Sequence, residues 1–79
     1  MNFATRLREL RTENELTQVE LAELLEVHRI TVSRWERATL LPGYSALIKV
    51  STLFGVSSDY LLGLDRISDE SKTDIRQSM

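Results

Sequence analysis

The fold of this chain is decided by residues 16–37, which read LTQVELAELLEVHRITVSRWER. The first half predicts a helix that begins after Thr17, because Thr17 and Glu20 have the spacing of a capping box. Leu16 and Leu21 flank this start at the positions of a hydrophobic staple. We expect the buried face of this helix to consist of Leu21, Ala22, Leu24 and Leu25.

The second half predicts another helix over about 29–37, after a break near Glu26 and Val27. Two helices at 18–25 and 29–37, joined this closely, have the proportions of a helix-turn-helix motif. Val32 and Trp35 lie three residues apart and give the second helix its inward side. The side chains that then point outward, or to one flank, are Arg29, Ile30, Ser33, Arg34 and Arg37.

This outward face suits the major groove of DNA. Arginine can bind guanine in a bidentate manner, serine accepts several partners, and an aliphatic side chain can contact a thymine methyl group. A charged outward face is also what any solvated helix shows, and single exposed apolar residues are common. The helix face alone therefore leaves both interpretations open.

The remaining segments also show helical spacing, and no stretch alternates with period two. We expect helices over about 3–14 and 44–54, with Gly55 as the left-handed residue that closes the latter. A short helix then starts at the cap Ser57 and ends at Gly63. The prediction is an all-α domain of five helices over 1–63, followed by a tail or short additional helix over 64–79.

Composition excludes several classes of protein. The 79 residues contain no cysteine and one histidine, with 42% hydrophobic and 28% charged residues, which is typical of a globular domain without disulfides. We find no cysteine nucleophile, glycine-rich phosphate loop or histidine-rich metal set, and so expect no enzyme, cofactor or metal. No apolar run is long enough for a membrane span and no signal layout begins the chain, so we expect a cytoplasmic protein. The net charge of −2 gives no hint of nucleic-acid binding.

Four motifs occur in the same order as in a known family: RLRELR at 6–11, LTQVELA at 16–22, VSRWER at 32–37 and GVSSDYLLG at 55–63. Together they closely resemble the Cro and phage-repressor (Xre-like) helix-turn-helix family, over residues 3–63 without a gap. The resemblance implies a compact, lambda-repressor-like domain whose third helix enters the major groove of double-stranded DNA. Such proteins often bind a palindromic operator as homodimers.

The resemblance also assigns roles to individual residues. The base-facing positions are Arg29, Ile30, Ser33 and Arg34. Positions that hold or orient phosphates are Thr17, Gln18, Arg37, Gly43 and Tyr44. The structural positions are an ion pair of Arg11 with Glu36 and the core residues Ala22, Val32 and Trp35. For a dimer contact, the apolar surface left over is Tyr60, Leu61, Leu64 and Ile67.

The sequence departs from the family pattern at three places. Glu26 and Ala38 stand where a glycine is usual, and because a left-handed residue other than glycine costs roughly 1 kcal/mol, we expect some reshaping of either turn. His28 replaces the usual serine or threonine cap, and we expect it to pack or cap rather than bind a ligand. The loop at 39–41 lacks a cation, and its Leu40 and Leu41 either pack on the domain or contact a protein.

The sequence therefore predicts a sequence-specific DNA-binding regulator from a bacterium or phage, acting as a repressor. Two alternatives stay open. One is a protein-interaction module that kept the fold and lost DNA, and the other is an antitoxin-type regulator whose residues 64–79 bind a toxin. No effector pocket is evident from the sequence.

Overall fold

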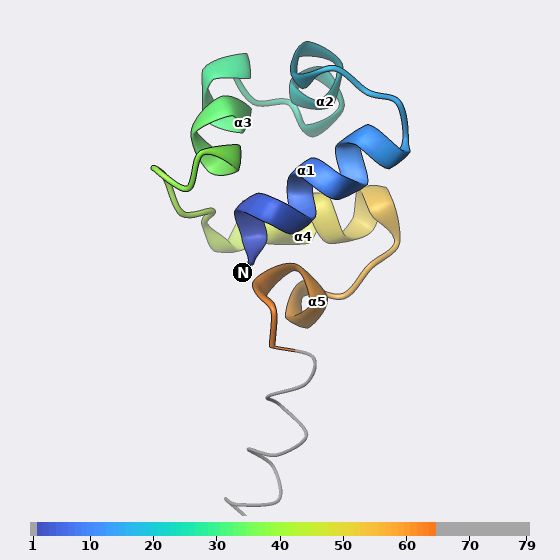
Figure 1. The fold of residues 1–79 in the computed structure, drawn as a ribbon, viewed down its shortest axis with the longest axis vertical. Helices are drawn as coiled ribbons and strands as arrows, with labels where there is room; N and C mark the ends of the chain where they lie inside the picture. Colours follow the sequence, from blue (N-terminus) through green and yellow to red (C-terminus); the bar gives the residue numbers. More distant parts are fainter. Residues whose placement is uncertain (1, 65–79) are drawn as a thin grey trace, which may run out of the picture.

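The computed structural model describes residues 2–64, and these form five α-helices and no strand. The helices are α1 (Phe3–Glu13), α2 (Gln18–Leu25), α3 (Arg29–Glu36), α4 (Tyr44–Phe54) and α5 (Ser58–Leu62) (Figure 1). The predicted all-α fold and the order of its helices are confirmed. Apart from Leu64, the predicted C-terminal segment lies outside the described residues.

Side-chain caps fix where three of the helices begin. The hydroxyl of Thr17 accepts a hydrogen bond from the Glu20 amide at 3.0 Å, and the Glu20 carboxylate accepts one from the Thr17 amide at 2.9 Å. Ser57 likewise accepts from the Tyr60 amide at 3.0 Å. His28 Nδ1 accepts from the amide of Ile30 at 3.1 Å and its side chain is exposed, so this histidine caps α3 rather than packing inward.

Both turns that lack the usual glycine still adopt the left-handed conformation. Glu26 has φ 60° and Ala38 has φ 60°, so the expected reshaping is wrong. Each turn is closed by a backbone hydrogen bond: the Val27 amide donates to the Ala22 carbonyl at 3.0 Å, and the Thr39 amide donates to the Arg34 carbonyl at 3.0 Å. These closing bonds satisfy helix-end carbonyls and offset the strain of a side chain at positive φ.

The core lies where α1 packs against α3 and α5, and where α2 meets α3 and α4. In Figure 1, α2 and α3 lie at one end of the domain and α5 at the other, with α1 and α4 between them. The rings of Phe3 and Trp35 meet edge to face with centroids 5.8 Å apart. The buried apolar side chains are Phe3, Leu7, Leu10, Leu21, Ala22, Leu25, Val32, Trp35, Val50 and Leu61.

The predicted buried face of α2 is wrong at one residue. Leu24 is 54% exposed, whereas Leu21, Ala22 and Leu25 are buried. Leu24 projects to the flank of α2, where it borders a groove against Leu53 of α4 instead of entering the core. In the part of the chain that the structure describes, no helix is long and apolar enough to cross a membrane.

Candidate nucleic-acid interface

Helix α3 has one buried and one exposed face. Val32 is fully buried, and Trp35 and Glu36 are each 4% exposed. On the opposite side Ile30 is 44% exposed. That face also holds four polar residues: Arg29, Arg34 and Arg37 are exposed, and Ser33 is half-buried. The predicted outward set therefore shares one surface, with Ser33 set deeper than the helical wheel suggests.

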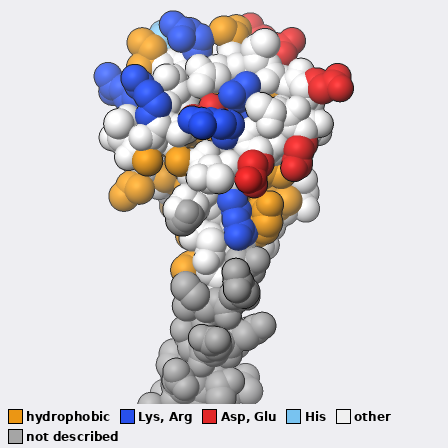
Figure 2. All heavy atoms as spheres, viewed as in Figure 1, with side chains coloured by type: hydrophobic (Ala, Val, Ile, Leu, Met, Phe, Trp, Pro, Cys, Tyr) orange, Lys and Arg blue, Asp and Glu red, His pale blue; other side chains and the backbone are white. Residues whose placement is uncertain are grey.

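The charges of the domain are separated on its surface. Figure 2 shows basic side chains over α3 and at the middle of this face, and acidic side chains along its opposite edge, from the α2 side down over α1. The basic group includes the exposed Arg29, Arg34 and Arg37, and exposed acidic residues on α2 include Glu20 and Glu23. A chain with a formal net charge of −2 can therefore still present a basic helix, because the only acidic residue of α3, Glu36, is buried and the exposed acidic residues lie on other segments.

A buried carboxylate ties α1 and α2 to the end of α3. The Glu36 side chain is 1% exposed and accepts two hydrogen bonds from Arg11, from Nε at 2.7 Å and from Nη2 at 3.1 Å. Gln18 Nε2 donates to the same carboxylate at 3.1 Å. The hydrogen bond that Arg11 donates to Glu36 raises the pKa of the Arg11 guanidinium. The ion pair implied by the family resemblance is present, and it fixes the position of α3 relative to α1.

Arg8 joins this cluster, and sequence reasoning missed it. Its Nη2 donates to the Glu36 backbone carbonyl at 3.1 Å, and its Nε lies 3.8 Å from the Glu36 carboxylate. The signal was the three-residue spacing of Arg8 and Arg11, which places both on the same face of a helix. Arg8 thereby satisfies a carbonyl near the C-terminal end of α3, where a cation also interacts favourably with the helix dipole.

The starts of α2 and α4 both offer backbone amides near the surface. Thr17 is exposed at the cap of α2, and Gln18, the first residue of that helix, is half-buried. At α4, Gly43 caps without a side-chain hydrogen bond, and Tyr44 is 81% exposed. The first amides of a helix have no partner within the helix, so they can bind an anion.

The apolar surface predicted for a dimer contact is only partly exposed. Leu61 is fully buried in the core, so its place in that surface is wrong, and Ile67 lies outside the described residues. Tyr60 is half-buried and its ring lies 4.2 Å from the Arg6 guanidinium, which also donates to the Tyr60 carbonyl at 2.7 Å. Leu64 is 39% exposed. Leu62 of α5 is a further exposed apolar side chain at this end, at 37%.

The loop between α3 and α4 keeps an apolar tip in solvent. Leu40 is 40% exposed and Leu41 is 85% exposed, so Leu41 does not pack into its own domain. Within residues 2–64, no three histidine, cysteine, aspartate or glutamate side chains are placed to hold a metal ion.

Comparisons with known proteins agree with this geometry. Residues 7–61 match the helix-turn-helix family. The chain is 40% identical over 75 residues to the HTH-type transcriptional regulator ImmR of Bacillus subtilis (strain 168), covering 95% of this chain and 59% of that protein. It is 35% identical over 79 residues to the HTH-type transcriptional activator BcrR of Enterococcus faecalis, covering 100% of this chain and 39% of that protein.

Two solved structures share the fold. The P22 c2 repressor in complex with a synthetic operator has a TM-score of 0.74 and 29% identity, covering 78% of this chain and 94% of that chain. A transcriptional regulator from Listeria innocua has a TM-score of 0.75 and 35% identity, covering 78% of this chain and 58% of that chain.

The chain spans only 59% of the length of ImmR and 39% of that of BcrR. The match over residues 7–61 nevertheless includes all of α2, α3 and α4 and the contacts around Glu36. By sequence and by structure, this chain belongs to the helix-turn-helix family.

Proposed function

We propose that this domain binds double-stranded DNA sequence-specifically, as part of a bacterial or phage transcriptional regulator that acts as a repressor. The observation that carries the proposal is the exposed face of α3, where Arg29, Ile30 and Arg34 stand opposite the buried Val32 and Trp35. That face combines donors for base edges with an aliphatic contact, and the rest of the domain holds it rigidly.

Helix α3 lies in the major groove in this proposal. Arg29 and Arg34 can each make a bidentate contact to guanine, while Ile30 can contact a thymine methyl group. Ser33, being half-buried, reaches only a base that approaches the helix closely. The contacts of Glu36 with Arg11 and Gln18 orient α3 before DNA arrives, so little ordering is needed on binding.

The phosphates on either side of the groove are held by helix starts and one cation. Thr17 and Gln18 lie at the start of α2, and Gly43 and Tyr44 at the start of α4. Amides at these positions can hydrogen-bond phosphate oxygens, which fixes the position of the protein without reading sequence. Arg37, the exposed C-cap of α3, adds a direct charge.

The proposal includes a homodimer on a palindromic operator, in the cytoplasm and without enzymatic activity. A single domain presents few cations to the phosphates, and phosphate contacts supply much of the affinity of DNA-binding proteins. Two domains at half-sites about one helical turn apart would compensate for this. The apolar side chains that support a contact between copies are those of Tyr60, Leu62 and Leu64.

Selection of bound sequences from a random DNA pool tests this function. We expect enrichment of an inverted repeat, and affinity for the enriched duplex that falls steeply as salt is raised. Enrichment of a single, unrepeated half-site would contradict the dimer but keep the DNA-binding function.

The same experiment decides between DNA binding and the protein-interaction alternative, which the 85% exposure of Leu41 favours. No enrichment and no dependence on salt would refute DNA binding and leave that alternative. An antitoxin role depends on residues 64–79, of which only Leu64 is described, and deletion of residues 64–79 would test it through loss of toxin neutralisation with DNA binding retained.

A further inference from the structure

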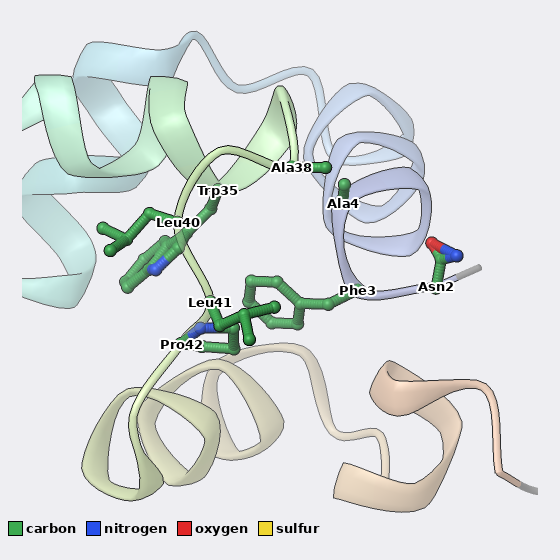
Figure 3. Close-up of a pocket in the computed structure, with 8 residues that line it drawn as sticks. All are labelled: Asn2, Phe3, Ala4, Trp35, Ala38, Leu40, Leu41 and Pro42. Atoms are coloured by element: carbon green, nitrogen blue, oxygen red, sulfur yellow. The ribbon is translucent and has the colours of Figure 1, made fainter.

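A hollow lies between the start of α1, the second half of α3 and the loop that leads to α4. Its walls include Phe3, Ala4, Trp35, Ala38, Leu40 and Leu41, and its volume is about 220 Å³. Figure 3 shows Phe3 of α1 and Trp35 of α3 with Leu40, Leu41 and Pro42 of the loop around them, so the hollow is bounded by the core and by an exposed loop. No charged side chain lines it.

Apart from the side-chain amide of Asn2 at its edge, the wall has one polar side-chain group, the indole N–H of Trp35, and this group has no hydrogen-bond partner in the part of the chain that the structure describes. Trp35 is 4% exposed, and its indole Nε1–H makes no hydrogen bond to any group within residues 2–64. Every side-chain nitrogen or oxygen that is fully buried in this part of the chain does have a partner, so the Nε1–H is not sealed in the core. In Figure 3 the indole nitrogen lies on the edge of the ring nearest Leu41 and Pro42.

An apolar occupant would cover this donor and shield it from water. A buried donor without an acceptor costs free energy, so the site favours a molecule that brings an acceptor to the indole N–H. The volume of the hollow, about 220 Å³, also limits the size of the ligand. An apolar cavity of about 150 Å³ holds benzene, so this hollow has room for one ring with a small substituent. Since charged side chains are absent from the walls, the ligand should be neutral.

We propose that this hollow binds a neutral organic molecule of single-ring size, with a carbonyl-type oxygen that accepts a hydrogen bond from Trp35 Nε1. The site is separate from the exposed face of α3 that the proposed function uses. It adds an effector site to a domain in which the sequence alone shows none.

The occupant would also weaken DNA binding, and this part rests on the proposed function. Phe3 and Trp35 are buried and pack on each other, so the wall that can yield is the loop with the exposed Leu40 and Leu41. That loop joins α3 to Gly43, where α4 begins. Moving it changes the spacing between the base-reading helix and a proposed phosphate contact. By linkage, bound operator must weaken ligand binding by the same factor.

Ligand binding can be measured without DNA, because Trp35 is the single tryptophan of the chain and its indole N–H gives one resonance in a proton–nitrogen correlation spectrum. The probes are two pairs of equal shape, acetophenone with α-methylstyrene and cyclohexanone with methylenecyclohexane. In each pair an oxygen replaces a CH₂ group. We expect saturable shifts of the indole resonance at millimolar concentrations, with each ketone binding about fivefold more tightly than its partner.

A pair of variants locates the site. Ala4→Leu adds a side chain to the wall of the hollow and should abolish the shifts, whereas Thr52→Leu makes a matched addition to the groove between α2 and α4 and should not. If Ala4→Leu does not fold, Leu41→Ser removes an exposed wall residue and should weaken binding of both ketones instead. No saturable shift with either ketone, or equal affinity within both pairs, would overturn the site.

A separate measurement tests whether the ligand regulates DNA binding. We expect acetophenone to weaken binding to the pool-selected operator in the wild-type protein and not in Ala4→Leu. A saturable indole shift with unchanged operator affinity would refute regulation and keep the site. Failure of the pool selection would refute the proposed function, while the indole titration would still decide whether the hollow binds its ligand.

Discussion

Replacing Arg11 by methionine should destabilise the domain by about 3–5 kcal/mol, because it strands a buried carboxylate. The change removes both hydrogen bonds to Glu36 and a third, from Arg11 Nη1 to the Leu16 carbonyl at 2.9 Å. The Glu36 carboxylate still accepts the hydrogen bond from the Gln18 side-chain amide. Its remaining cation is Arg8, whose Nε lies 3.8 Å from the carboxylate and whose side chain is 58% exposed. Such an exposed and distant cation compensates little.

The size of this loss matters for so short a chain. At roughly 0.05–0.15 kcal/mol per residue, a protein of this length has a total stability of about 4–12 kcal/mol. Arg11→Met should therefore be marginally folded at room temperature. Urea unfolding followed by the fluorescence of the buried Trp35 measures the change by linear extrapolation.

The double variant Arg11→Met with Glu36→Met separates a stranded charge from lost packing. Without the Arg11 and Glu36 charges, the penalty of burying an unpaired carboxylate disappears. The remaining cost is that of leaving the Leu16 carbonyl and the Gln18 side-chain amide without partners, about 1–2 kcal/mol. Arg34→Met is the matched control, because this arginine is exposed, and it should change stability by less than about 0.5 kcal/mol. A cost below about 1 kcal/mol for Arg11→Met would refute the reasoning. So would a double variant less stable than Arg11→Met alone.

Three further predictions concern backbone and pH. Ala38→Gly should stabilise the domain by about 0.5–1 kcal/mol in urea unfolding, because Ala38 has φ 60°, and a loss of stability would contradict the strain argument. Gly55→Ala should cost about 1 kcal/mol, because φ at this residue is +67°, although a Cβ would meet nothing within 4 Å; an unchanged free energy of unfolding would count against this. The hydrogen bond to Glu36 raises the pKa of Arg11, so the stability that this ion pair contributes is complete below the unfolded-state pKa of arginine and is lost only as pH rises through the folded-state pKa. The free energy of unfolding should therefore not fall between about pH 7 and 10 on account of this pair. A free energy of unfolding that falls over this pH range in the wild-type protein, but not in the double variant Arg11→Met with Glu36→Met, would contradict this prediction.

Local chemistry made much of the fold predictable. The capping box of Thr17 and Glu20 and the left-handed glycines Gly55 and Gly63 are set by neighbours in sequence, and the structure contains all of them. The sequence predicted that Leu24 is buried and that Leu61 is part of an exposed surface, and both predictions were wrong because each residue stands beside a second leucine. Helical spacing alone does not say which of two adjacent leucines faces the core, and the packing partner decides it.

The candidate site was predictable in outline for a similar reason. A helical wheel anchored on Val32 and Trp35 separates the exposed arginines of α3 from its buried face. The hollow beside Trp35 was not predictable, since it depends on the path of the irregular segment from Ala38 to Gly43. Periodicity carries no information about such a loop, nor about whether an indole N–H finds a partner.

The measurement that tests the central claim most directly is the base preference of Arg34→Ala on the pool-selected operator, compared with Lys49→Ala. Both changes remove one positive charge, but Arg34 lies exposed on α3, whereas Lys49 lies on α4 and donates to the Leu25 carbonyl at 3.2 Å. If α3 reads bases, Arg34→Ala should lose about 5- to 150-fold in affinity and relax the preference at one base pair, while Lys49→Ala keeps the wild-type preference. Unchanged base preference in Arg34→Ala, with an affinity no lower than that of Lys49→Ala, would contradict the assignment of α3 as the recognition helix.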